Sequence, residues 1–253
     1  MRAIRLERIM SILKQRGYAT VEELAKELGV SEITVRRDLD ILQGQGLVER
    51  KRGGAVLKSF SYEVPFFLKL ERRKEQKIRI AKKAASLLEN DWTVFMMGGT
   101  TVYYMAQALD DSQVHDLTII TNSITTAWAV INLHKSYELI HTGGMVRPGS
   151  FECVGEEVVE KIGYMNFDLL IMGADGVDAV EGVTIANHSE SVIARKAAER
   201  AKRIMVLADS EKIGVVKAYR ALSLKELDVL ITDDGVDPDF VSKIPPSLRL
   251  YSV

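Results

Sequence analysis

Residues 31–55, SEITVRRDLDILQGQGLVERKRGGA, predict a helix, a turn marked by glycines and a short basic hairpin. The helix begins at Ser31, whose hydroxyl can accept hydrogen bonds from free backbone N–H groups. One side of it is apolar at helical spacing and predicts contact with a core; it comprises Val35, Leu39 and Leu42. The opposite side has no anionic residue and comprises Ile33, Thr34, Arg37 and Ile41, with Arg36 on the flank.

The exposed side of this helix has the residue types that a helix needs to enter the major groove of DNA. Such a helix presents small or hydrogen-bonding side chains to base edges and cations to phosphates. An ordinary amphipathic helix with solvated arginines is the alternative. The neighbouring segments decide between the two, because a DNA-binding helix is expected to belong to a recognisable motif.

The upstream segment supplies the first part of such a motif. Thr20 and Glu23 have the spacing of a capping box, which starts a second helix over 20–28. Gly29 ends that helix, and the next begins two residues later. Two helices separated by so short a turn predict a helix-turn-helix.

The downstream segment predicts a wing. Residues 47–50 and 55–57 are expected to form two strands, and Gly53-Gly54 permits the tight turn between them. We therefore predict a winged helix-turn-helix in which Thr34 and Arg37 contact base edges and Ile33 meets a thymine methyl group. The predicted phosphate contacts are Ser31, Arg36, Arg50, Lys51 and Arg52.

Residues 5–57 resemble the DNA-binding half of the DeoR family of bacterial transcription regulators. The resemblance depends on the run Thr-Val-Arg-Arg-Asp-Leu at 34–39 and on Gly-Gly-Ala at 53–55. Arg52 departs from the family, which usually has histidine there, and the departure adds positive charge. The resemblance implies sequence-specific binding of duplex DNA in the regulation of transcription.

Length, charge and cysteine content restrict the class of protein. A chain of 253 residues suits two domains of ordinary size. Residues 1–57 have a net charge of +3 and residues 58–253 of −4, so the excess cation lies where DNA would bind. Cys153 is the only cysteine, which excludes an intrachain disulfide. Because there is no apolar signal region and no apolar run of about 18 residues, we expect a cytoplasmic protein without a membrane segment.

Residues 58–76 are predicted to link residues 1–57 to a second domain over 77–253. Pro65 disfavours helix at the preceding residue, so the start of the linker is expected to be extended. The charged run 71–77 is expected to start a helix that continues to Leu88. Four residues between these segments are too apolar for a free tether, and we expect them to dock on the second domain or on a partner subunit: Phe66, Phe67, Leu68 and Leu70.

The second domain alternates short apolar runs with helical patterns. The runs lie at 94–97, 117–121, 139–141, 169–173, 204–208 and 229–232, and the helical patterns lie at 102–109, 124–133 and 189–201. Buried strands that alternate with helices predict an α/β fold with a mostly parallel sheet. In open sheets of this kind, ligands bind at the carboxyl ends of the strands.

The residues that follow five of these strands suit a phosphorylated polyol. Glycines let backbone N–H groups approach an anion, and a helix N-terminus adds a favourable dipole. Lys212 adds a point charge, while Asn122 and Asp175 can bond to sugar hydroxyls. Each motif alone is also common at turns and helix starts, so the prediction depends on finding five such motifs together. The predicted effector-binding residues are Gly98, Gly99, Thr100, Thr101, Thr121, Asn122, Gly143, Gly144, Asp175 and Lys212.

Residues 71–233 resemble the sensor domain of the same family, which is similar in fold to ribose-5-phosphate isomerases. The matching pieces include Gly99-Thr100-Thr101, Thr121-Asn122-Ser123 and Gly173-Ala174-Asp175-Gly176. The resemblance implies a repressor of sugar or carbohydrate metabolism genes that a phosphorylated sugar releases from DNA. Met97 and Gly98 depart from the more usual Asp-Ser, and Glu211 and Ile213 flank Lys212 where serine and phenylalanine are usual.

Two other functions fit parts of the sequence. A sugar-phosphate isomerase would need an acid and a base beside a sugar carbon, and Asp175, Asp209 and Lys212 are candidates. The same groups would serve binding alone, and a fused DNA-binding domain favours sensing, so we expect no enzyme activity. A regulator that responds to a non-sugar ligand or to a protein partner is the other alternative, which Met97 keeps open.

Cofactors are not expected, whereas self-association is. The four histidines lack metal-ligand spacing, and no nucleoside-triphosphate-binding loop occurs, so we expect no metal and no other cofactor. One small domain covers too little DNA for strong specificity. We therefore expect a homo-dimer or homo-tetramer on repeated half-sites.

Overall fold

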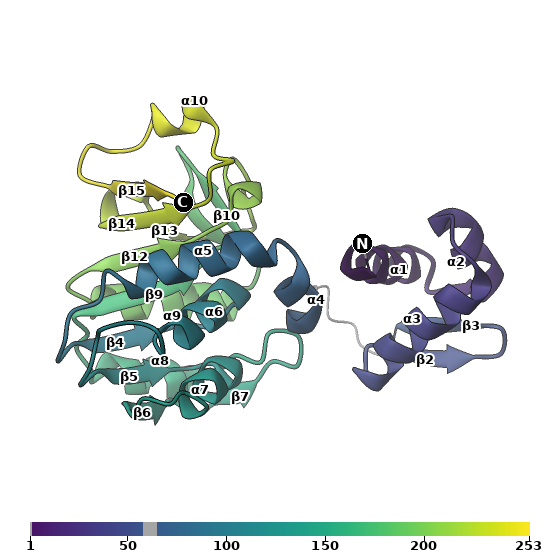
Figure 1. Cartoon of the computed structure of the whole chain (residues 1–253), viewed down its shortest axis with the longest axis horizontal. Coiled ribbons are helices and arrows are strands. Elements are labelled where there is room, and N and C mark those ends of the chain that lie inside the picture. The colour runs from purple at the N-terminus through teal and green to yellow at the C-terminus, as the bar shows by residue number, and fades with distance from the viewer. Residues whose placement is uncertain (1, 58–64) are drawn as a thin grey trace. The chain divides into compact units, whose positions relative to one another are not determined.

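The computed structural model describes residues 2–57 and 65–253, which form two compact units that divide between Arg72 and Arg73 (Figure 1). The first unit contains α1 (Arg2–Arg16), β1 (Tyr18–Thr20), α2 (Val21–Leu28), α3 (Glu32–Gly44), β2 (Val48–Lys51), β3 (Gly54–Leu57) and α4 (Phe66–Glu71). Thr20 and Glu23 form both hydrogen bonds of the capping box before α2, and Gly29 ends that helix in the left-handed conformation. The predicted winged helix-turn-helix is confirmed by this order of elements.

The wing has a third strand that the sequence analysis missed. β3 pairs with β2 on one side and with β1 on the other, and both pairings are antiparallel. Gly54 lies opposite Thr20, where a Cβ atom would overlap the backbone carbonyl of Ala19. Gly54 is therefore needed for this close approach of β1, whereas Gly53 has the positive φ of the turn.

The core of the first unit lies between its helices and includes Ile9, Leu13, Leu24, Leu39 and Leu42, all fully buried. Leu68 of α4 packs into the same core, and α4 contacts α1. The expectation that the apolar segment at 66–70 docks on the second domain or on a partner is therefore wrong for Leu68. Residues 58–64 of the predicted linker lie outside the described residues.

The second unit is built on a seven-stranded parallel sheet in the order β15-β14-β12-β9-β4-β5-β6. Its strands are β4 (Thr93–Met96), β5 (Thr118–Thr121), β6 (Glu138–His141), β9 (Leu169–Gly173), β12 (Ile204–Leu207), β14 (Val229–Thr232) and β15 (Arg249–Ser252). The predicted α/β class and its six strands are confirmed, and β15 is an additional edge strand.

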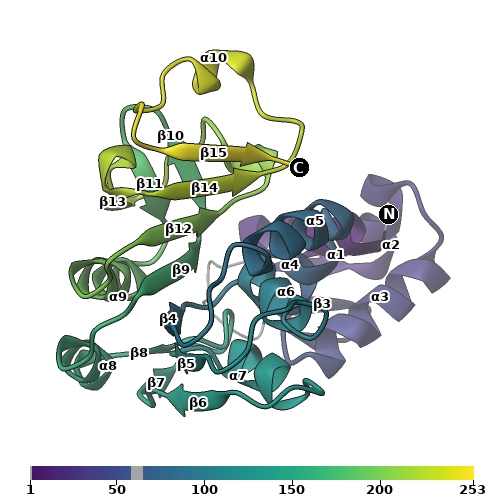
Figure 2. The same ribbon diagram turned by 60° about the vertical axis from the view of Figure 1, so that its left-hand side comes forward.

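Helices cover both faces of this sheet. One face carries α5 (Lys74–Ala85), α6 (Thr100–Ala108) and α7 (Ile124–Ile131), and the other carries α8 (Glu156–Gly163) and α9 (His188–Glu199) (Figure 2). The shorter elements are the hairpin of β7 (Met145–Val146) and β8 (Cys153–Val154), the small sheet of β10 (Gly176–Asp178), β11 (Gly182–Ile185) and β13 (Tyr219–Leu222), and α10 (Pro238–Val241). Within the described ranges, no helix is long and apolar enough to cross a membrane.

Candidate functional site

The predicted recognition helix, α3, has the two faces that the sequence indicated. Ser31 precedes it and its hydroxyl accepts a hydrogen bond from the backbone N–H of Thr34 at 3.3 Å. The apolar positions of α3 are buried, whereas Ile33, Arg36 and Arg37 are exposed and Thr34 is half-buried. The helix therefore presents its polar and cationic side to the surface.

The basic residues differ in how they are held. Arg36 pairs with Glu32 one turn earlier at 3.0 Å. On the wing, Arg50 donates to Asp40 of α3 at 2.6 Å, and Lys51 pairs with Glu49 at 2.5 Å. The Arg50–Asp40 bond fastens the wing to α3. A phosphate that reached these cations would have to compete with carboxylates that the sequence analysis did not foresee.

Arg37 and Arg52 are in a different situation. Both are exposed, and within residues 2–57 and 65–253 neither side chain has a hydrogen bond or an ion pair. Tyr18 donates to the backbone carbonyl of Arg52, which fixes the turn of the wing and leaves the guanidinium available. These two arginines therefore meet a phosphate or a base without first losing an ion pair.

Asp38, which belongs to the run Thr-Val-Arg-Arg-Asp-Leu, anchors α3 to α1. Its carboxylate is buried and accepts two hydrogen bonds from Arg5, at 2.5 Å from Nε and 3.1 Å from Nη2. The two residues are 33 positions apart in the chain, so no local pattern predicts the pair. This bidentate contact sets the position of the recognition helix within the first unit.

In the second unit, the topology predicts where a ligand binds. From β4 the chain proceeds to β5 and β6 on one side, and it then returns to β9, β12, β14 and β15 on the other. The loops after β4 and β9 thus run in opposite directions from neighbouring strands. In open parallel sheets this divergence opens a crevice at the carboxyl ends of the strands, and ligands bind there.

The structure places all ten predicted effector residues at this edge of the sheet. The loop after β4 and the start of α6 supply Gly98, Gly99, Thr100 and Thr101, and the ends of β5 and β6 supply Thr121, Asn122, Gly143 and Gly144. Asp175 follows β9 and accepts a hydrogen bond from the N–H of Ala186 at 2.9 Å. Lys212 follows β12 and is half-buried. Their roles in binding remain predictions.

The N-terminus of α6 lies at the switch point. Gly99 caps it with a φ of +115° and, having no side chain, accepts no hydrogen bond from the first turn. By contrast, the neighbouring α7 is capped by Ser123, which accepts from the N–H of Thr126 at 3.2 Å. The first turn of α6 therefore offers N–H groups and a partial positive charge to an anion.

The β7–β8 hairpin brings further polar residues to the same edge of the sheet. These residues were not predicted from the sequence. Arg147 and Ser150 contact the carboxylate of Glu190, which lies in the first turn of α9. Glu152 is buried next to Asn122, with 3.5 Å between Asn122 Nδ2 and Glu152 Oε2. The local signal for this hairpin is the turn sequence Arg-Pro-Gly-Ser at 147–150, which lies between Met145-Val146 and Cys153-Val154.

His141 shapes the glycine turn after β6. Its Nδ1 accepts a hydrogen bond from the N–H of Gly143 at 3.0 Å, which requires an unprotonated Nδ1. Burial, together with the nearby charge of Lys161, lowers the pKa of His141 below its ordinary value. Gly143 and Gly144 have φ values of +74° and +105°, so the turn needs glycine at both positions.

Arg73 holds the loop that carries Lys212. Its guanidinium donates to Asp233 at 2.7 Å and to Ser210 at 2.9 Å, and Asp209 lies 3.6 Å away. Burial raises the pKa of Asp233, but hydrogen bonds from Ser210 and the charge of Arg73 outweigh it, so the pKa is lowered. Arg73 joins residues 137 and 160 positions away, which explains why the sequence did not reveal it.

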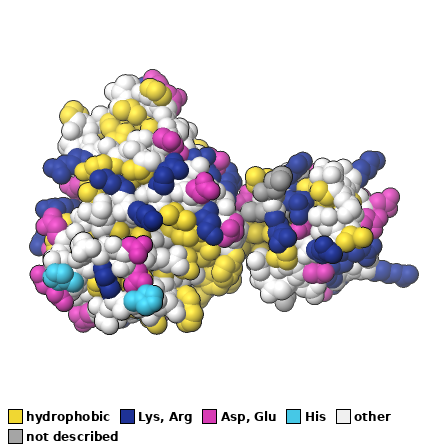
Figure 3. Space-filling view, viewed as in Figure 1, with side chains coloured by type: hydrophobic (Ala, Val, Ile, Leu, Met, Phe, Trp, Pro, Cys, Tyr) yellow, Lys and Arg dark blue, Asp and Glu magenta, His cyan; other side chains and the backbone are white. Residues whose placement is uncertain are grey.

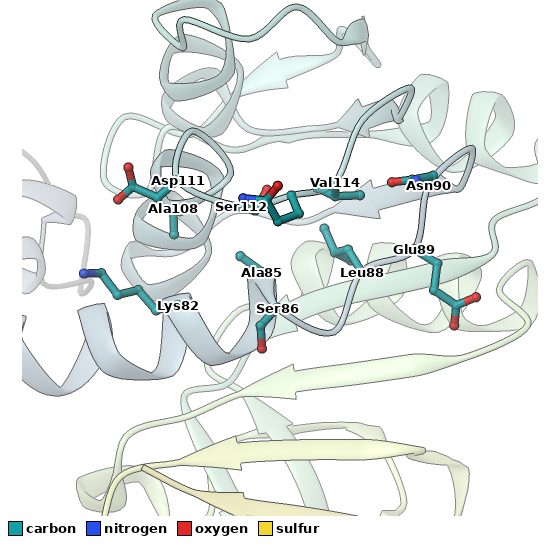
Figure 4. Close-up of a pocket in the computed structure, with 11 residues that line it drawn as sticks. Lys82, Ala85, Ser86, Leu88, Glu89, Asn90, Ala108, Asp111, Ser112 and Val114 are labelled. Carbon is teal, nitrogen blue, oxygen red and sulfur yellow. The ribbon is translucent and has the colours of Figure 1, made fainter.

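A separate pocket of about 670 Å³ lies at the opposite edge of the sheet, where α5 and α6 end (Figure 4). Its lining includes Lys82, Glu89, Asn90, Asp111 and Ser112. Helix C-termini present carbonyl groups, which disfavour an anion. This pocket therefore does not compete with the switch point as a site for a phosphate. Across the described residues, no group of histidine, cysteine and carboxylate side chains is arranged to hold a metal ion.

An apolar stripe lies on the outer side of α7. Ile124, Trp128 and Ile131 are 41%, 63% and 66% exposed, and α7 contains no charged residue. Met145 of β7 is also largely exposed. Figure 3 shows hydrophobic side chains gathered in the region of α7 and β7. A patch of this kind on a surface commonly marks a binding site for another protein.

Comparisons with known proteins match both units. The family model for the DeoR-like helix-turn-helix domain matches residues 5–60, and that for the DeoR C terminal sensor domain matches residues 72–234. The HTH-type transcriptional repressor GlcR of Bacillus subtilis is 34% identical over 90% of this chain and 87% of its own. The glycerol-3-phosphate regulon repressor of Escherichia coli is 31% identical over 89% of this chain and 88% of its own.

Among solved structures, ribose 5-phosphate isomerase from Plasmodium falciparum aligns with 54% of this chain and 52% of its own. The TM-score of that alignment is 0.39 and the sequence identity is 18%.

Proposed function

Because this chain belongs to the DeoR family of transcriptional regulators, we propose that it is a repressor that a phosphorylated sugar or polyol releases from its operator. The proposal of a phosphorylated effector is supported by the N-terminus of α6, which is capped by Gly99 and lies at the switch point of the parallel sheet. Helix N-termini of this kind bind phosphate through backbone N–H groups and the helix dipole.

On the DNA side, we assign base contacts to Thr34 and Arg37 and a thymine methyl contact to Ile33. Arg37 supports this assignment because it projects from the exposed side of α3 with no competing carboxylate among the described residues. The phosphate contacts are assigned to Ser31, Arg36, Arg50, Lys51 and Arg52. A protein with this task acts beside the chromosome, so we also propose a cytoplasmic location.

The relatives support a phosphorylated effector. One of them is named for the glycerol-3-phosphate regulon, and another is the lactose phosphotransferase system repressor of Lactococcus lactis, 33% identical over 94% of both chains. The relatives are transcription regulators, and we propose that this chain likewise senses its ligand without converting it. Turnover of ribose 5-phosphate or of a hexose phosphate by the purified chain would contradict that proposal.

The test measures, by fluorescence anisotropy, the binding of labelled duplex DNA from the promoter region of the protein's own gene. Adding a panel of sugar phosphates, with the unphosphorylated sugars as controls, should dissociate the complex with one phosphorylated member only. A ligand acts in this way only if it binds the DNA-free state more tightly. A tight complex that no phosphate alters would support DNA binding but contradict the proposed effector.

Lys212 and Lys202 provide a matched pair for locating the phosphate. Lys212 follows β12 at the proposed site, whereas Lys202 precedes the same strand and pairs with Asp168 at the opposite edge. Lys212→Ala should abolish the response to the effector and leave DNA affinity within about twofold, since a lysine supplies phosphate with a point charge. Lys202→Ala should keep both properties. An undiminished response in Lys212→Ala would move the phosphate away from this loop.

We further propose that the chain acts as a homo-dimer or homo-tetramer and that the stripe on α7 contacts a second copy. An uncharged helix suits a two-fold interface, because each copy presents the same surface and no like charges meet. Trp128→Glu should lower the mass measured by light scattering to that of one chain. The same substitution at the exposed Tyr164, outside the stripe, should not.

A further inference from the structure

The β7–β8 hairpin fixes Glu152 over the carboxyl ends of two central strands. Glu152 and Ser123 form an antiparallel bridge, and the N–H of Cys153 donates to the carbonyl of Asn122 at 2.7 Å. These backbone contacts attach the hairpin to the end of β5. Glu152 is 6% exposed, so its carboxyl group lies within the unit and not on its surface.

Gly98 provides the space for this side chain. A Cβ atom on Gly98 would overlap the Glu152 side chain and lie 2.6 Å from its Oε1. The φ of Gly98 is not in the left-handed region, so glycine is required here by the close approach of Glu152 and not by the backbone conformation. Met97, the preceding residue, is buried and apolar, which leaves the loop after β4 without an acceptor side chain of its own at these two positions.

Asn122 lies on the other side of the Glu152 carboxyl group and has an unused acceptor. Its Nδ2 donates to the carbonyl of Cys153 at 3.0 Å and lies 3.5 Å from Glu152 Oε2. Its Oδ1 is buried and, among the described residues, receives no hydrogen bond. A buried acceptor without a donor is unfavourable, so a donor supplied by a ligand would stabilise this arrangement.

These observations place an acceptor group directly beside an anion site. Gly98 immediately precedes Gly99, which caps the α6 N-terminus where the phosphate is proposed to bind. A ligand that fits both features is anionic at one end and carries hydrogen-bond donors a few atoms away. Hydroxyl groups on neighbouring carbons are such donors, because each can donate to a carboxylate or to an amide oxygen.

We propose that Glu152 and Asn122 recognise two neighbouring hydroxyl groups of the effector, with Glu152 Oε1 and Asn122 Oδ1 as acceptors. This inference rests on the proposed function and adds to it the residues that read the sugar. The effector is thus a phosphorylated sugar or polyol with adjacent free hydroxyls near its phosphate. Gly98 is a positioning residue, since a side chain at this position would displace Glu152.

The test separates sugar recognition from phosphate binding by isothermal titration of the full chain. The probes are ribose 5-phosphate, fructose 6-phosphate, glucose 6-phosphate, glycerol 3-phosphate and inorganic phosphate. Glu152→Gln keeps the shape of the side chain and removes its charge. It should weaken the best sugar phosphate about 10- to 100-fold, as expected for loss of a hydrogen bond to a charged acceptor, and leave inorganic phosphate within about twofold.

Two further variants make the result decisive. Glu156→Gln is the same substitution at an exposed position four residues later, and it should change neither affinity. Gly98→Ala should displace the Glu152 side chain and reproduce the Glu152→Gln pattern, which covers the case in which Glu152→Gln does not fold. Tryptophan fluorescence verifies folding, because Trp92 and Trp128 both lie in the second unit.

The outcomes distinguish this inference from the proposed function. If the unmodified chain binds a sugar phosphate and folded Glu152→Gln and Gly98→Ala bind it equally well, the acceptor assignment is overturned and sensing stands. Equal weakening of sugar phosphate and inorganic phosphate would also overturn it, because Glu152 would then support the whole site. If the unmodified chain binds none of the probes, sensing of a phosphorylated sugar and the acceptor assignment both fail.

Discussion

Replacing Arg5 with alanine should unfold the first unit selectively. Arg5 donates two hydrogen bonds to Asp38, a residue of the recognition helix that is 1% exposed. The substitution would leave the Asp38 carboxylate buried without its cation. Because Arg5 lies on α1 and Asp38 on α3, the substitution removes the contact that orients the DNA-binding surface.

The magnitude follows from the burial of Asp38, whose side chain is 2% exposed, whereas that of Arg5 is 21% exposed. Removing one partner of a buried ion pair costs about 3–5 kcal/mol, because the remaining charge is uncompensated. A unit of about 70 residues has a total stability of roughly 3.5–10 kcal/mol at 0.05–0.15 kcal/mol per residue. The loss is therefore comparable with the whole free energy of unfolding of the first unit, and DNA binding should be lost with it.

The positions of the tryptophans allow the two units to be followed separately. Trp92 and Trp128 both lie in the second unit, so their fluorescence reports that unit alone, whereas far-UV circular dichroism reports the helices of both. In a urea titration of Arg5→Ala, part of the circular dichroism signal should be lost at low urea while the fluorescence transition stays unchanged.

Arg16→Ala is the matched control, since Arg16 ends the same helix and pairs with Glu27 at 2.7 Å on the exposed surface. An exposed pair of this kind contributes about 0–1 kcal/mol, so the control should unfold nearly as the unmodified chain does. If Arg5→Ala and Arg16→Ala shift the low-urea transition equally, the role assigned to the buried pair is refuted.

Three other substitutions test separate parts of the structure. Arg37→Ala should cost roughly 1–3 kcal/mol on the operator only, measured by anisotropy, and equal weakening on random DNA would make Arg37 a phosphate contact. Thr20→Ala should lower the urea stability of the first unit by about 1 kcal/mol through loss of the α2 cap, and no change would contradict the role of that cap. His141 has a lowered pKa, so the unfolded chain binds its proton first and the second unit loses stability as pH falls below about 6.5. His141→Gln should flatten that decline between pH 7 and pH 5 in tryptophan-monitored unfolding, and an unchanged slope would assign the decline to other groups.

Features of the fold that depend on local sequence could be predicted. The capping box at Thr20 and Glu23 and the apolar positions of α3 interact within a few residues, so they predict the helix-turn-helix directly. Six strands of the large sheet are short apolar runs between helices, and their parallel pairing follows from that alternation. Strand β1 was missed because it has only three residues and depends on the absence of a side chain at Gly54.

Contacts between distant segments could not be predicted in this way. The ten predicted effector residues lie at the same edge because each lies at or after the carboxyl end of a parallel strand, which is a consequence of topology. Glu152, Arg73 and Arg5 reach their sites from a hairpin, a unit boundary and another helix, over separations of 30 to 160 residues. Nothing in the residue types around them distinguishes these side chains from ordinary surface charges.

The carboxylates beside the wing have a consequence for how the protein searches a chromosome. Arg50 forms an ion pair with Asp40, and Lys51 forms one with Glu49. DNA of any sequence must displace these two carboxylates before its phosphates can contact Arg50 and Lys51. The operator adds base contacts to these phosphate contacts, whereas other DNA offers its phosphates alone. Because the cost of displacing the carboxylates is the same for every sequence, it weakens and shortens encounters with other DNA and leaves the ratio of the two affinities unchanged.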